Sequence, residues 1–212
     1  MIFIMRAILH SRSGHTVLVT TVAMCALAAF TGRRSIELDL SAQYPPTKMA
    51  VVELCSILTA TLLAIQMRPR FWEWDRLAAR RPSGYRPCTL AAVTAAAGIG
   101  LPALCVPAVV PTLPPNTPWA WVLANALLMA AIVQLIAPLL TPLAAGTVAL
   151  VAWFGCGLAT NLAPGLWLPV SSYHELQGRW FVVSVLAVVT VVLHAVTCGR
   201  TTWAHRQFGK HE

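Results

Sequence analysis

Long apolar runs separated by short polar pieces make up most of the chain. Six of these runs are long enough, together with their flanks, to supply the ~20 residues that an α-helix needs to cross a bilayer. The pattern predicts spans at residues 16–31, 47–67, 89–110, 119–139, 143–163 and 179–198. We therefore expect an all-α fold: a polytopic membrane protein with six transmembrane helices in a single transmembrane domain, residues 1–212.

Prolines mark two places where the backbone should depart from a regular helix. Pro102 and Pro107 lie inside the third span, so we expect a kink or a break there. Thr141-Pro142 leaves only a very tight connection between the fourth and fifth spans. Between the first two spans, residues 32–46 carry both signs of charge and a Tyr-Pro-Pro turn, and we interpret them as an external loop.

The first fifteen residues are too few to span a membrane, but they mix apolar and basic side chains. Ile4 and Ile8 alternate with Arg6 and Arg12, a mixture that is typical of a helix lying in the membrane interface. We expect such an N-terminal interfacial helix. The alternative is that these residues are a frayed start of the first span.

A charged segment at residues 68–88 separates the second and third spans and holds six of the fifteen basic residues. Phe71, Trp74 and Leu77 recur at intervals of three and can share one side of a short amphipathic helix. The arginines that accompany this helix are Arg76, Arg80 and Arg81. We interpret the segment as a cytoplasmic loop that contains a short amphipathic helix; the alternative is that its arginines only orient the spans and its aromatic residues lie at the level of the lipid headgroups.

The distribution of basic residues predicts the orientation of the bundle. With the amino terminus inside, eleven of the fifteen basic residues fall on inner pieces of the chain and four on outer pieces. Lys and Arg concentrate in cytoplasmic loops, so we expect both termini to be cytoplasmic. The expected location is the cell membrane, as in a multi-pass protein of a bacterial inner (plasma) membrane.

Composition supports the membrane class and excludes two others. Hydrophobic residues make up 58% of the chain and charged residues only 10%, with a mean hydropathy of +0.70. Soluble domains carry about 25% charged residues. The net charge of +8 suggests nucleic acid, but the arginines lie in short pieces between apolar runs, so we expect the lipid bilayer as partner and no nucleic acid.

Polar residues inside the spans are the candidates for a substrate path. Glu53 lies about seven residues into the second predicted span, where a carboxylate is costly and Lys48 is near enough to reach toward it. Its role is substrate contact, proton relay or gate; the alternative is an interhelical hydrogen bond that only fixes packing. Asn125 and Asn161 are further candidates, although amides in membrane helices more often join helices.

Sequence motifs of enzymes and cofactor sites are missing, so we expect no enzymatic activity, cofactor or metal. His174-Glu175 lacks the second His of a zinc protease motif, and neither a G-x-S-x-G nor a Walker A sequence occurs. The six cysteines form no C-x-x-C and are expected to pack as small apolar residues.

The order of these parts resembles the membrane (permease) subunit of ABC exporters of the O-antigen and multidrug-exporter type. Such permeases have an interfacial helix, six spans, a coupling helix between spans two and three, a tight inner connection between spans four and five, and short outer helices before span six. The counterparts here are Met1–His15, the six apolar runs, Phe71–Arg81, Thr141-Pro142 and Pro164–Gly178. The likeness is one of layout.

The resemblance implies a transmembrane permease subunit that exports its substrate with a separate ATP-binding subunit. It also implies a homo- or heterodimer with another permease half, and coupling to the ATPase through Phe71, Trp74 and Leu77. Two alternatives stay open: a substrate-capturing membrane subunit of an importer, and a non-transport immunity or assembly factor.

Overall fold

A computed structural model describes residues 14–31, 34–39, 47–68, 85–110, 119–163, 176–199 and 201. Its helices are α2 (Gly14–Thr31), α3 (Val51–Gln66), α5 (Tyr85–Ala103), α6 (Cys105–Val109), α7 (Trp119–Ile136), α8 (Pro142–Leu162) and α9 (Leu176–Thr197). Two short strands, β1 (Ser35–Leu38) and β2 (Thr47–Ala50), pair as an antiparallel ribbon.

Five helices of the described part are long and apolar enough to cross a membrane. They are Gly14–Thr31, Cys88–Val109, Trp119–Ile136, Pro142–Leu162 and Arg179–Thr197. These correspond to the first, third, fourth, fifth and sixth predicted spans. The expectation of an apolar helical membrane protein is therefore supported by both length and composition.

The predicted second span at 47–67 is partly wrong, because its first four residues form β2 and the helix begins only at Val51. The remaining 16 residues make a helix about 24 Å long, shorter than the ~30 Å hydrocarbon core. The external loop at 32–46 was also too simple a prediction, since Ser35–Leu38 within it forms β1. Alternation of Ile36 and Leu38 with polar neighbours is the strand signal that was missed.

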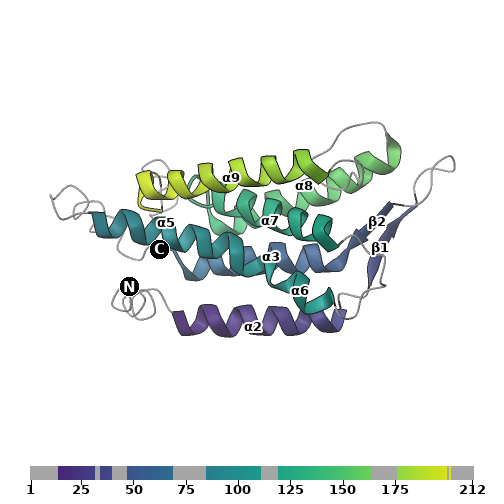
Figure 1. The fold of residues 1–212 in the computed structure, drawn as a ribbon, viewed down its shortest axis with the longest axis horizontal. Helices are drawn as coiled ribbons and strands as arrows, with labels where there is room; N and C mark the ends of the chain where they lie inside the picture. Colours follow the sequence, from purple (N-terminus) through teal and green to yellow (C-terminus); the bar gives the residue numbers. More distant parts are fainter. Residues whose placement is uncertain are drawn as a thin grey trace.

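The helices run side by side along the long axis of the molecule (Figure 1). α7 lies in the middle and packs against α3, α5, α8 and α9, whereas α2 and α9 form opposite edges. The start of α2 and the end of α9 lie at the same end of the bundle, and the ribbon of β1 and β2 lies at the other.

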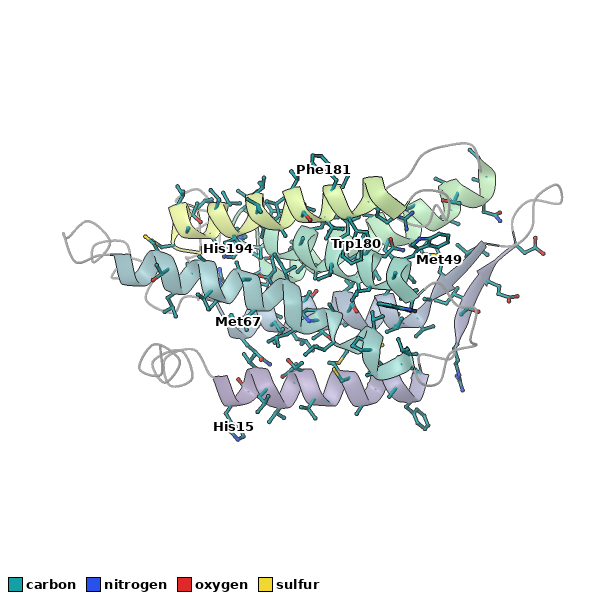
Figure 2. All side chains as sticks on the ribbon, viewed as in Figure 1. His15, Met49, Met67, Trp180, Phe181 and His194 are labelled. Carbon is teal, nitrogen blue, oxygen red and sulfur yellow. The ribbon has the colours of Figure 1, made fainter. Side chains whose placement is uncertain are left out.

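The outward faces of the bundle are covered with large apolar side chains. On α2, Phe30 is 87% exposed, and on α9, Phe181 and Val196 are 72% and 78% exposed. Figure 2 shows Phe181 pointing away from the other helices. Soluble monomers rarely expose apolar surface on this scale, so these faces are suited to contact with lipid chains.

A break at Leu104 separates α5 from α6, as the two prolines of this span predict. Neither Pro102 nor Pro107 has an N–H to donate, so the helical hydrogen-bond ladder is interrupted on both sides of the break. Ser56 of α3 donates its hydroxyl to the carbonyl oxygen of Pro102 at 3.1 Å. This hydrogen bond joins α3 to the backbone next to the break.

Gly146 lets α8 approach α3 closely, and its replacement should destabilise the bundle. A Cβ at this position would collide with the side chain of Thr61, including its Cβ at 3.1 Å, whereas a Cβ on Gly155 of the same helix meets nothing within 4 Å. We expect Gly146→Ala to lower the free energy of unfolding by about 1–3 kcal/mol. Thermal unfolding in detergent measures this, with Gly155→Ala as the matched control. Equal stability of the two variants would contradict the packing account.

The predicted orientation can be checked with single cysteines placed in a background that lacks the native ones. We expect a membrane-impermeant thiol reagent applied to intact cells to label Glu37→Cys in β1 and to spare Ser83→Cys in the central loop. Labelling of position 83 in sealed cells, with position 37 unlabelled, would show that the orientation is the reverse of the predicted one.

Candidate functional site

Four buried polar side chains from four helices meet at one place in the bundle interior. Asn125 of α7 donates from Nδ2 to Oε1 of Glu53 at 2.9 Å, and Trp153 of α8 donates from Nε1 to Oε2 of Glu53 at 2.7 Å. Arg179 of α9 donates from Nη1 to Oδ1 of Asn125 at 3.1 Å. We call Glu53, Asn125, Trp153 and Arg179 the charged cluster.

The local structure explains how each of these residues reaches the cluster. Glu53 lies in the first turn of α3, where the positive end of the helix dipole favours a carboxylate. Arg179 lies near the start of α9. Asn125 is in the first half of α7, the central helix, and its amide bridges the carboxylate on one side and the guanidinium on the other.

Every member of the charged cluster is almost inaccessible. Exposure is 6% for Glu53, 5% for Asn125, 1% for Trp153 and 5% for Arg179. Arg179 is linked to Glu53 through Asn125, whose amide accepts from the guanidinium and donates to the carboxylate. Both carboxylate oxygens of Glu53 accept a hydrogen bond, one from Asn125 and one from Trp153, so the buried carboxylate has a partner on each oxygen.

The structure brings two predicted site residues together and places the third nearby in another role. Glu53 and Asn125 share a direct hydrogen bond, as a substrate path or a packing contact both require. Asn161, 1% exposed near the end of α8, instead donates from Nδ2 to the carbonyl oxygen of Leu38 at 3.0 Å. It therefore ties the ribbon of β1 and β2 to the helices at the same end of the bundle.

One expectation about Glu53 needs correction. Because α3 begins at Val51, Glu53 lies in the first turn of its helix and not about seven residues into a span. Arg179 is linked to Glu53 through Asn125, a connection that the sequence did not suggest. Lys48 occupies the register position opposite Glu37 in the strand pair.

Arg179 and Trp153 were missed as site residues. Arg179 was counted only as a basic residue flanking the sixth span, and Trp153 lay unremarked inside the fifth. A signal for Trp153 was present, since an indole N–H in the middle of an apolar run needs an acceptor when buried. For Arg179 the signal was its place directly before an apolar run.

A second buried polar group lies toward the other end of the bundle. Gln134 of α7 donates from Nε2 to the carbonyl oxygen of Ala60 at 3.2 Å. The backbone carbonyl oxygen of Gln134 lies 2.7 Å from Nε2 of His194. Gly98 of α5 packs directly on the Gln134 side chain, where a Cβ would not fit. His194 is 8% exposed and is therefore buried at this contact. These contacts join helices, as expected for an amide in a membrane bundle.

The predicted partner-coupling residues lie outside the described part of the chain. They are Phe71, Trp74, Arg76, Leu77, Arg80 and Arg81. Most of the predicted interfacial segment Met1–His15 and of the predicted outer helices Pro164–Gly178 also lies outside it. Gly14 and His15 instead begin α2, and residues 176–178 begin α9. Among the described residues, no group of three or more His, Cys, Asp or Glu side chains is arranged to hold a metal ion.

Comparison with known proteins adds no relative. No protein-family model matches the chain, and searches of curated proteins and of solved structures give no significant match. The functional assignment therefore depends on the layout of the sequence and on the charged cluster.

Proposed function

We propose that the chain is the membrane permease subunit of an ATP-driven, ABC-type transporter that exports its substrate together with a separate ATPase subunit. The observation that carries this proposal is the charged cluster: Glu53 and Arg179 are buried, bridged by Asn125, inside a bundle whose interior is mostly apolar. Ionisable residues in such a place are expensive and characteristically belong to substrate or ion paths.

The geometry of the charged cluster supports a role in a transport path over a role as a simple contact between two helices. Four separate helices supply the cluster, so a relative movement of any one of them changes the partners of Glu53 or Arg179. Asn125 bridges the two charges through different atoms of one amide, and an incoming charged or strongly polar solute can replace either of its bonds. This is the behaviour expected of a gate along a transport route.

The layout of the sequence supports the ABC assignment and supplies the coupling element. The chain carries no nucleotide-binding motif, so the energy must come from a partner protein. The loop at 68–88, with Phe71, Trp74 and Leu77 on one side of its predicted helix, is the contact for that ATPase. The second copy or second permease half would complete the transporter.

The test is purification of the tagged full-length chain from its native membranes in a mild detergent, followed by identification of the proteins that accompany it. We expect a protein with a Walker A sequence in near-stoichiometric amount. Recovery of the chain with no nucleotide-binding protein contradicts the proposal.

A second candidate is a substrate-capturing membrane subunit of an importer. The observation that favours it is the position of the charged cluster and of Asn161 at the end of the bundle that carries the strand ribbon. On the predicted orientation this end faces outward, where a solute would be captured. The same purification distinguishes the two, because this candidate requires an additional membrane scaffold subunit between the chain and the ATPase.

A further inference from the structure

Two cysteines from distant parts of the sequence lie side by side at the end of the bundle opposite the strand ribbon. Cys88 lies in the first turns of α5, and Cys198 directly follows α9; their Sγ atoms are 3.7 Å apart. α5 and α9 also pack against each other, so this contact belongs to an extended helix pair. We propose that Cys88 and Cys198 are a redox-active thiol pair that a hydroperoxide converts into a disulfide.

The backbone around Cys198 holds this thiol in place. Cys198 adopts a left-handed conformation with φ 52°, which residues with a Cβ rarely adopt, and Gly199 follows with φ 85°. The N–H of Gly199 donates to the carbonyl oxygen of His194, and the N–H of Thr201 donates to that of Pro138. The turn that ends α9 is thereby fixed on both sides of the cysteine.

A disulfide is reachable from this geometry by a small adjustment. Bonded sulfurs are about 2.05 Å apart, so the two Sγ atoms must approach by roughly 1.6 Å, a distance that side-chain rotation covers. Other cysteines also approach one another: the Cys105 side chain contacts that of Cys25, and Cys55 and Cys105 contact the hydroxyls of Thr31 and Thr59. Those three cysteines lie on α2, α3 and α6, whereas Cys88 and Cys198 lie at the end of the bundle on α5 and directly after α9.

The two thiols differ in access, which assigns their roles. Cys88 is half-buried and Cys198 is 3% exposed. The Cys88 thiol loses its proton and the resulting thiolate attacks one peroxide oxygen, forming a sulfenic acid; the hydroxide that leaves takes up that proton and departs as water. The Cys198 sulfur then attacks the sulfenic sulfur, and the hydroxyl that leaves takes up the Cys198 thiol proton and departs as a second water. Overall, two thiols and one hydrogen peroxide give one disulfide and two waters, with the thiols oxidised and the peroxide reduced.

The bond would connect the C-terminal end of the predicted loop at 68–88, whose last four residues begin α5, with the end of α9. Cys198 directly precedes the basic C-terminal tail. On the predicted orientation both face the cytoplasm, where the pair is kept reduced until peroxide rises. Oxidation then fixes the end of the loop to the end of α9. The chemistry of the pair itself is independent of the proposed transport function.

The experiment uses the full-length chain, reduced, freed of reductant, and exposed to hydrogen peroxide in detergent. Free thiols are then alkylated under denaturing conditions and the digest is examined by mass spectrometry. We expect peptides linked through Cys88 and Cys198 that separate on treatment with dithiothreitol. Cys156→Ser, a control in α8, should keep this link, whereas Cys88→Ser should lose it.

A second variant keeps the test decisive. With Cys198→Ser, the Cys88 sulfenic acid has no resolving thiol and should be captured by dimedone. The proposal is overturned if the folded wild-type chain retains both alkylatable thiols after peroxide treatment. It is also overturned if Cys88 becomes linked only to a second copy of the chain.

Discussion

Glu53→Ala is expected to lower the free energy of unfolding by about 3–5 kcal/mol, the cost of removing one partner from a buried charge pair. The alanine leaves Arg179 buried without the nearby carboxylate, and it also removes the acceptor for Trp153 and Asn125. Glu53→Gln should cost less, about 1–3 kcal/mol, because the amide still hydrogen-bonds while the charge is lost.

Equilibrium unfolding in detergent, followed by circular dichroism, measures these differences. Glu37→Ala is the matched control, since Glu37 is an exposed carboxylate in β1 and its loss should change stability by no more than about 0.5 kcal/mol. If Glu53→Ala unfolds like the control, the carboxylate does not balance Arg179 in the folded protein.

The second large effect is expected in the central loop. Trp74→Ala combined with Leu77→Ala should leave insertion and orientation intact, because topology depends on Lys and Arg and is largely indifferent to the remaining residues. The double variant should nevertheless release the ATPase on purification and abolish transport, since truncation of aromatic anchors at a contact centre typically costs ~2 kcal/mol or more each.

Arg80→Lys serves as the matched control in the same loop, because it keeps the charge and should have only a mild effect. Co-purification of the ATPase, compared between the double variant and this control, is the measurement. A double variant that retains its ATPase and still transports shows that Phe71, Trp74 and Leu77 do not form the coupling surface.

Much of the fold follows from the apolar runs alone. The five long helices lie where hydropathy predicts them, within a few residues, because a bilayer imposes both their length and their composition. The break at Leu104 and the start of α8 at Pro142 follow from local proline chemistry. Thr141 caps that helix, accepting the N–H of Ala144 at 3.2 Å, as a tight connection requires.

The strand ribbon could not be predicted with the same ease. Four residues give too little periodicity to distinguish a strand from a loop, and β2 continues directly into α3 without a breaker residue. Packing decides instead: Ile36 and Leu38 contact the helical core, and Met49 seats against Gly157 of α8. Such long-range contacts leave no local signal.

Two of the four residues of the charged cluster, Glu53 and Asn125, were predicted from the sequence as site residues. A carboxylate inside an apolar run is conspicuous, so Glu53 was identified, and Asn125 was found by the same reasoning. The link from Glu53 through Asn125 to Arg179 depends on how α9 packs on α7, and Arg179 is over 120 residues away from Glu53 in sequence. Tertiary packing of this kind is not visible in the local sequence.

Transport by a chain that lacks both charges tests the central claim most directly. The double variant Glu53→Gln with Arg179→Gln removes the carboxylate and the guanidinium together, so neither leaves the other unbalanced. We expect it to be more stable than either single variant, to retain its ATPase, and to fail to complement a strain that lacks the chromosomal copy. Full complementation by this double variant would mean that the charged cluster only joins helices and has no part in a transport path.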